Sequence, residues 1–234
     1  MLEIEGLTRR YGDELAVDGL STRLARGELT VLVGRSGAGK TTLLRCLDGL
    51  EPPDSGTITV DGASLAATDA ALVFQSGALV DGKSALENVL DGALGREPTW
   101  RELLGWHSPD EKRAAVERLH DVELAGYADR PVEALSGGQQ QRVGIARALN
   151  QRPDVLLADE PVASLDPETG RAVLSVLARA VRDHDLVGLV SLHQPGLATS
   201  VADHYLGMEH GRLVLDRQAG QVDSDDIEAV YADG

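Results

Sequence analysis

The chain has 234 residues, 42% of them hydrophobic, which is enough apolar material for a folded core. It carries 38 acidic residues against 22 lysines and arginines, and the resulting formal charge of −16 disfavours nonspecific binding to nucleic acids or anionic lipid surfaces. The single cysteine, Cys46, excludes an intrachain disulfide, and no apolar run reaches the ~18–20 residues that a membrane span needs.

The N-terminal residues 1–5 are acidic and read as a β-strand, so we do not expect a signal peptide. The chain should therefore stay in the cytoplasm and, if it serves a membrane, dock to other chains there. Two interpretations of the acidic charge stay open. The simpler one is an ordinary solvated surface, and the other is adaptation to a high-salt cytoplasm, where screening removes the self-repulsion.

A phosphate-binding loop is predicted near the N-terminus. Residues 29–33 form a continuous apolar run typical of a strand buried on both faces, and residues 34–41 then match GxxxxGK[ST] in full, at the start of a helix expected over 41–50. Glycines let successive N–H groups point inward, and the helix N-terminus adds partial positive charge. Lys40 would neutralise the β- and γ-phosphates of ATP, and Thr41 would bind Mg²⁺. The predicted nucleotide contacts in this segment are Gly34, Arg35, Ser36, Gly37, Ala38, Gly39, Lys40, Thr41 and Thr42.

The middle of the chain has a different composition. Residues 57–62 read as a strand that ends in a turn, whereas residues 84–150 contain no good strand and several helical patterns. One helix start is clear at Ser108, because a proline follows at the first helical position and Glu111 stands three residues after the serine. We therefore expect a helical subdomain inserted into an α/β core.

Two carboxylates follow the next buried strand. Residues 155–158 are apolar and lead directly into Asp159 and Glu160. Asp159 can hold Mg²⁺ at the tip of the strand, and Glu160 can reach the water that attacks the γ-phosphate, as a general base or a positioning group. Residues 187–192 are another buried strand. A strand pair over 205–209 and 212–216 follows, and then an acidic segment with one short helix near 227–231.

The sequence LSGGQQQR at residues 135–142 resembles the signature sequence of ABC ATPases. In that family the signature opens a helix and faces the γ-phosphate held by the opposite subunit, so the resemblance implies an ATP-dependent homodimer with two composite sites. The signature residues would be Ser136, Gly137, Gly138 and Gln139, acting on the partner's ATP.

Other family elements appear in order along the chain. Gln75 resembles the glutamine that senses Mg²⁺ and water and couples to the membrane subunits, and Asp166 lies in a segment similar to the loop that crosses the dimer interface. His193 resembles the histidine that contacts the γ-phosphate. Tyr11 stands where the family places an aromatic ring against adenine, although a packing role remains an alternative for it.

The resemblance covers about residues 2–216. It implies an α/β fold: a P-loop NTPase (RecA-like) core with an antiparallel β subdomain and an inserted α-helical signature subdomain. The expected division is one domain over 1–216, with the core at about 1–83 and 151–216 and the helical subdomain at about 84–150, followed by an acidic tail over 217–234. Only 35 positions separate Lys40 from Gln75, fewer than we expect for the family, so a peripheral element between 57 and 72 should be shortened.

Finer similarity points to one transport group. Residues 88–96, 99–106 with Trp100 and Trp106, 158–167 and 192–194 are similar to those of phosphonate-import ATPases. The resemblance implies an ATP hydrolase at the cytoplasmic side of the cell membrane, bound peripherally to two permease subunits and served indirectly by an extracytoplasmic substrate-binding protein, with no nucleic-acid partner. An importer of phosphite, phosphate esters or another small solute remains an alternative, as does an ABC ATPase without a transport role.

Overall fold

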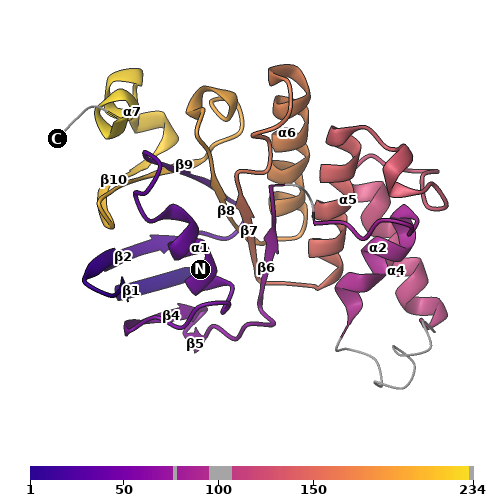
Figure 1. Ribbon diagram of the computed structural model, residues 1–234, viewed down its shortest axis with the longest axis horizontal. Coiled ribbons are helices and arrows are strands. Elements are labelled where there is room, and N and C mark those ends of the chain that lie inside the picture. Colours follow the sequence, from indigo (N-terminus) through magenta and orange to yellow (C-terminus); the bar gives the residue numbers. More distant parts are fainter. Residues whose placement is uncertain (76–77, 95–106, 232–234) are drawn as a thin grey trace.

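Figure 1 shows the computed structural model, which describes residues 1–75, 78–94 and 107–231. Trp100 and Trp106, both named above for their similarity to phosphonate-import ATPases, lie outside the described residues. Within those residues, no helix is both long enough and apolar enough to cross a bilayer.

The described strands form two sheets. One has four strands in the order β2-β1-β4-β5, and its neighbouring strands are antiparallel. The other has six strands in the order β10-β9-β3-β8-β7-β6, and all its neighbours are parallel except β10 and β9. The bounds are β1 Leu2–Tyr11, β2 Glu14–Leu24, β3 Leu29–Val33, β4 Ser55–Val60, β5 Ala63–Ser64, β6 Ala70–Val73, β7 Val155–Asp159, β8 Val187–Ser191, β9 His204–Glu209 and β10 Arg212–Gln218.

Burial on both faces explains the apolar runs of the larger sheet. All five residues of β3 and of β8 are buried. One face packs against α1, Lys40–Leu47, in a core shared with the antiparallel sheet. The opposite face packs against α6, Pro167–Asp183, and α5, Gly137–Asn150, in a second core. Helix α1 lies between the two sheets (Figure 1). A short loop joins β3 to α1, so the N-terminus of the helix lies at the carboxyl end of β3.

The elements between β6 and β7 are helical throughout the described residues and lie to one side of the sheets (Figure 1). They comprise α2 Ala85–Leu90, α4 Pro109–Asp121 and α5, with 3₁₀ turns at Asp91–Ala93 and Val132–Ala134. The predicted start of α4 is confirmed, because the Ser108 hydroxyl accepts a hydrogen bond from the Glu111 N–H at 3.2 Å and Pro109 is the first helical residue.

The ends of several elements differ from the predictions. Helix α1 ends at Leu47 and does not reach residue 50, because Gly49 adopts a left-handed conformation with φ of 74°. The expected strand over 57–62 begins earlier, at Ser55, and ends at Val60. Residues 65–69 then lead to β6 by a turn without a helix, where the short spacing predicted a trimmed element. The C-terminal segment holds α7, Ser224–Tyr231, which is longer than the helix expected there.

Candidate active site

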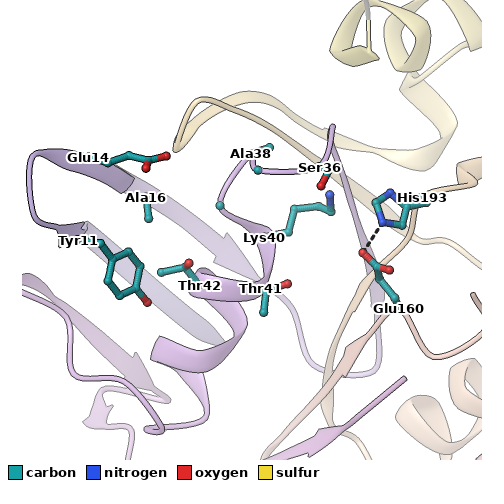
Figure 2. Close-up of a pocket in the computed structure, with 12 residues that line it drawn as sticks. Tyr11, Glu14, Ala16, Ser36, Ala38, Lys40, Thr41, Thr42, Glu160 and His193 are labelled. Carbon is teal, nitrogen blue, oxygen red and sulfur yellow. Dashed lines mark ion pairs between the residues drawn. The ribbon is translucent and has the colours of Figure 1, made fainter. Parts of the chain in front are cut away.

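A pocket of about 270 Å³ lies where α1 meets the end of β7 (Figure 2). It brings together side chains from the β1–β2 hairpin, the loop after β3, the first turn of α1, the tip of β7 and the segment after β8. Its lining residues are Tyr11, Glu14, Ala16, Ser36, Gly37, Ala38, Gly39, Lys40, Thr41, Thr42, Glu160 and His193. Ten of these twelve were predicted from the sequence as nucleotide-binding or catalytic residues.

Two glycines allow the loop after β3 to lie against neighbouring backbone. Gly34 has φ of 150°, and a Cβ atom there would lie 2.4 Å from the carbonyl oxygen of Met208. Gly39 has φ of 100°, and a Cβ atom there would lie 2.0 Å from the carbonyl oxygen of Ala16. Any side chain at either position would therefore displace the loop from β9 or β2. Glycine at both positions therefore allows the loop to adopt this conformation. The backbone N–H groups of such a loop can bind a chain of phosphates.

Lys40 is the buried cation of the pocket, with 5% of its surface exposed. Its Nζ atom donates to the carbonyl oxygens of Gly34 at 2.6 Å and Arg35 at 3.0 Å. Burial lowers the Lys40 pKa, whereas the negative charges of Glu160 and Asp159 act in the opposite direction. The lysine is thus held along the loop by neutral acceptors that the anionic oxygens of a phosphate could replace.

The tip of β7 is organised by Ser191, for which the sequence predicts only a place in a buried strand. Residues Asp159 and Ser191 are paired across β7 and β8. The Ser191 hydroxyl donates to Asp159 Oδ1 at 2.7 Å and accepts from the Glu160 N–H at 3.0 Å. The available sequence signal was a polar residue at the carboxyl end of an otherwise apolar strand.

Glu160 and His193 face each other at the end of the pocket opposite Tyr11 (Figure 2). The His193 Nε2 atom lies 2.5 Å from Glu160 Oε1. Glu160 has φ of 49°, which is uncommon for a residue with a side chain and turns the chain sharply after β7. The two predicted catalytic side chains are therefore in direct contact although 33 positions separate them in the sequence.

Four of the residues predicted to bind nucleotide or magnesium or to act in catalysis are not among the described lining residues of this pocket. Gly34 contributes its carbonyl oxygen to Lys40, and Arg35 instead lines a pocket of about 330 Å³ on the other side of the loop. Asp159 is held by Ser191. Gln75 is exposed two residues after Val73, which pairs with Ala158. Gln75 therefore follows β6 at the edge of the sheet where Asp159 ends the adjacent strand β7.

Two lining residues were not predicted. Glu14 pairs with Tyr11 across the tight β1–β2 hairpin, and Ala16 follows on the same strand face as Glu14. This placement depends on the register of the hairpin, which has three irregularities over the length of β1 and β2. The sequence pattern around Tyr11 alone does not specify that register.

Three of the four signature residues, Ser136, Gly138 and Gln139, line a different pocket, of about 360 Å³. Ser136 caps α5: its hydroxyl accepts from the Gln139 N–H at 3.4 Å, while the Gln139 side-chain oxygen accepts from the Ser136 N–H at 3.0 Å. Gly138 is buried, and a Cβ atom there would lie 2.5 Å from Cγ2 of Thr169. The signature turn is therefore packed tightly against the first turn of α6, away from the phosphate loop of its own chain.

Asp166 caps helix α6. One of its carboxylate oxygens accepts from the backbone N–H groups of Glu168 at 3.1 Å and Thr169 at 3.0 Å. The hydrogen bonds from Thr169 and Glu168 hold the pKa of Asp166 below its ordinary value. The predicted interface loop thus ends in a fixed helix start.

Tyr231 links the C-terminal helix to the first residue of the phosphate loop and to the end of the segment before His193. Its hydroxyl donates to the carbonyl oxygen of Leu192 at 3.3 Å and accepts from the Gly34 N–H at 3.4 Å. Burial raises the Tyr231 pKa, which keeps the hydroxyl protonated. Helix α7 therefore contacts both the first glycine of the loop and the residue before His193.

Comparisons with known proteins agree on one family. The family model described as ABC transporter matches residues 17–163. A relative from Natronomonas pharaonis, named Phosphonates import ATP-binding protein PhnC 1, is 72% identical over 233 residues, which cover 100% of both chains. A relative from Mycolicibacterium smegmatis, named Phosphate-import ATP-binding protein PhnC, is 46% identical over 96% of this chain and 89% of its own. The fold is also similar to the dimeric structure of MJ0796, a bacterial ABC transporter cassette, with a TM-score of 0.77 and 28% identity over 94% of this chain and 99% of that one.

Proposed function

Because this chain belongs to the ABC transporter family, we propose that it is the ATP-hydrolysing subunit of an ABC importer for phosphonates. The observation that carries the proposal is the pocket that joins residues 36–42 of the phosphate loop, Lys40 among them, to Glu160 and His193 within one chain. The substrate class is supported by the name of the relative that is 72% identical over the whole chain.

ATP would bind with its phosphates over the loop and its base at Tyr11. The backbone N–H groups of residues 36–42 and the N-terminus of α1 provide the positive field for the phosphates. Lys40 would exchange its two carbonyl partners for phosphate oxygens, a stronger interaction because the acceptors are then charged. Tyr11, 43% exposed at the rim, would stack against the adenine ring.

The residues present fit a magnesium ion. Its ligands would be the Thr41 hydroxyl, Asp159 and Gln75, together with phosphate oxygens, all of them the oxygen donors that Mg²⁺ prefers. The ion would supply neutralisation of the negative charge on the β- and γ-phosphates. Ser191 would orient the Asp159 carboxylate toward this position, because its hydroxyl already fixes one oxygen of that side chain.

Hydrolysis would use Glu160 to orient a water molecule for in-line attack on the γ-phosphate and to accept a proton from it. Lys40 and His193 would stabilise the charge that develops on the phosphate oxygens. His193 Nε2 lies 2.5 Å from Glu160 Oε1, so the second carboxylate oxygen, Oε2, would face the water.

A second copy of the chain would complete each site. Its Ser136, Gly137, Gly138 and Gln139 would cover the γ-phosphate, and its Asp166 loop would cross the interface. The Ser136 hydroxyl oxygen accepts from the Gln139 N–H, so its hydrogen can be donated to a phosphate oxygen. The dimeric form of a similar cassette supports this arrangement.

Closure of the dimer would drive the membrane partners. The chain would dock at the cytoplasmic side of the membrane to two permease subunits, through the surface near Gln75 and the helical region, and an extracytoplasmic substrate-binding protein would deliver the solute. Binding and hydrolysis of ATP would then select between two states of the permease. A second candidate solute is inorganic phosphate, because a relative 46% identical is named as a phosphate importer.

Growth of a strain lacking this gene tests the proposal, with a simple alkylphosphonate as sole phosphorus source and phosphate as the comparison medium. The strain is complemented with wild type, with Glu160→Gln, or with Glu117→Gln, which alters an exposed carboxylate on α4. We expect failure on phosphonate alone, rescued by wild type and Glu117→Gln but not by Glu160→Gln. Normal growth of the deletion strain on phosphonate, in a host without a second importer, would contradict the phosphonate assignment, and failure on phosphate would favour the second candidate.

A further inference from the structure

The Tyr11 ring is held by a group of charged side chains outside every motif described above. Its hydroxyl donates a hydrogen bond to Glu51 Oε2. The guanidinium of Arg9 lies 4.9 Å from the ring centroid, over one face of the ring. Arg9 and Tyr11 are two positions apart on β1, so both side chains project from the same face of the strand. One face and the hydroxyl of the ring are thus occupied within the protein.

Glu51 is the centre of this group. Its second carboxylate oxygen, Oε1, accepts from Arg45 Nη1 at 3.2 Å, and Arg9 Nε lies 3.6 Å from Oε2. The side chain is only 19% exposed although it carries a charge. Both carboxylate oxygens therefore have partners, and rotation of the carboxylate would break contacts with the ring and with Arg45 together.

Glu51 is also tied to the helix that carries the phosphate loop. Its backbone N–H donates to the carbonyl oxygen of Arg45 at 3.2 Å, just beyond the C-terminal end of α1. The opposite end of α1 begins with Lys40 and Thr41. The same rigid helix thus positions the phosphate contacts at its N-terminus and, through Glu51, the aromatic ring at the other side of the pocket.

We propose that Glu51 is a positioning residue for the nucleotide base: it orients the Tyr11 ring and sets the distance of that ring from the phosphate loop. The proposal rests on the proposed function, since it requires Tyr11 to receive the base. Glu51 itself need not touch the nucleotide. Its effect should therefore appear with ligands that carry a base and be absent with the phosphate chain alone.

The test compares binding of Mg-ATP, which carries a base, with binding of Mg-tripolyphosphate, which does not. Both are measured on the full chain by calorimetry. Glu51→Ala and Tyr11→Phe should each weaken ATP binding by about threefold to tenfold and leave tripolyphosphate binding unchanged. The double variant should be no weaker than Glu51→Ala alone, because both substitutions remove the same hydrogen bond. Glu51→Gln keeps an acceptor oxygen for the tyrosine and should retain most of the affinity. In steady-state hydrolysis the loss should appear in KM for ATP and not in kcat.

Glu3→Ala is the matched control, since Glu3 pairs with Arg23 at 3.1 Å and belongs to the same strand as Tyr11. Equal weakening of ATP and tripolyphosphate by Glu51→Ala, or additive effects in the double variant, would overturn the positioning role. Wild-type ATP affinity in Glu51→Ala would overturn it as well. Failure of the proposed function is distinguishable, because the wild-type chain itself would then bind neither ligand.

Discussion

His193 Nε2 lies 2.5 Å from Glu160 Oε1, so two side chains with separate proposed roles in hydrolysis are in direct contact. Figure 2 shows this contact across the pocket from Tyr11. While the pair persists, Glu160 would orient the water through its second carboxylate oxygen, Oε2. The arrangement therefore couples the position of the proposed general base to that of His193.

Glu160→Gln should abolish hydrolysis while keeping nucleotide binding, because the amide is the same size as the carboxylate but cannot accept a proton. We expect the rate to fall by about 10²–10⁴-fold. With Mg-ATP the variant should accumulate as a dimer, measured by size exclusion with light scattering. Glu117→Gln is the control and should hydrolyse ATP like wild type. A Glu160→Gln chain that remains monomeric with Mg-ATP would refute the composite-site arrangement.

Ser191→Ala should raise the magnesium concentration needed for half-maximal activity, since the Ser191 hydroxyl fixes both Asp159 and the backbone of Glu160. Loss of such an outer contact costs roughly tenfold in metal affinity or activity. The measurement is hydrolysis at saturating ATP over a magnesium titration, with Ser21→Ala as control because the Ser21 hydroxyl contacts only the antiparallel sheet, at the Gly6 N–H. An unchanged magnesium midpoint would show that Asp159 does not depend on Ser191.

Tyr231→Phe removes the hydroxyl that contacts Gly34 and Leu192 while keeping the buried ring. Leaving these two backbone groups without that partner should cost about 1 kcal/mol of unfolding free energy, or roughly 2–4 °C in Tm for a chain of this size. We also expect kcat to fall, because the phosphate loop and His193 lose a shared anchor. Tyr205→Phe, in a buried tyrosine of β9, is the comparison. A lower Tm with unchanged kcat would limit Tyr231 to a structural role.

Asp48→Asn should stabilise the chain at alkaline pH. Burial raises the Asp48 pKa from 3.8 to about 6, so the folded state binds this proton more tightly than the unfolded state. The resulting stability is present below pH 3.8 and is lost as pH rises through about 6. Asparagine lacks this titration, and we expect the variant to exceed wild type by roughly 1–2 kcal/mol at pH 8, with the excess vanishing near pH 4.

Asp61→Asn should show the opposite pH dependence. For both variants the free energy of unfolding is measured by denaturant titration at a series of pH values. The hydrogen bond from Arg26 lowers the Asp61 pKa to about 2, so its contribution is present above pH 3.8 and is lost as pH falls through about 2. The difference between wild type and Asp61→Asn should therefore shrink on acidification below pH 4.

For Asp48, a difference in unfolding free energy between wild type and Asp48→Asn that does not change with pH would contradict the burial of that carboxyl.

Salt should raise the thermal midpoint if the surface is adapted to a high-salt cytoplasm. The net charge is −16, and the screening length falls from about 10 Å at 0.1 M salt to about 3 Å at 1 M. We expect the midpoint to rise by several degrees over this range of KCl and to stay nearly constant in an uncharged osmolyte at the same osmolality. A midpoint that is flat or lower in molar KCl would favour the ordinary solvated surface.

Local patterns predicted the parts of the chain whose structure is set by neighbouring residues. The phosphate loop, the buried strand before Asp159 and the capped start of α4 at Ser108 each follow from a few consecutive residues, and the structure places them as expected. The end of α1 was wrong because the apolar pattern continues to Leu50, whereas Gly49 stops the helix first.

The residues that were missed depend on strand register or on contacts between elements. Glu14 faces the pocket only through its cross-strand pairing with Tyr11, and Ser191 reaches Asp159 only because β7 and β8 pair in one register. Tyr231 reaches Gly34 across 197 positions of sequence. No local pattern encodes these distances, since they arise from the packing of whole elements. The family roles of Gln75, Ser136 and Asp166 came from resemblance and remain predictions.

The close packing of Gly138 on Thr169 has a consequence for engineering hybrid transporters. Since a Cβ atom at position 138 would lie 2.5 Å from Thr169 Cγ2, a segment grafted onto residues 135–142 must keep glycine at position 138 or be combined with a smaller residue at position 169. A chimera that breaks this match would carry a packing defect between α5 and α6 that sequence similarity within either segment does not reveal.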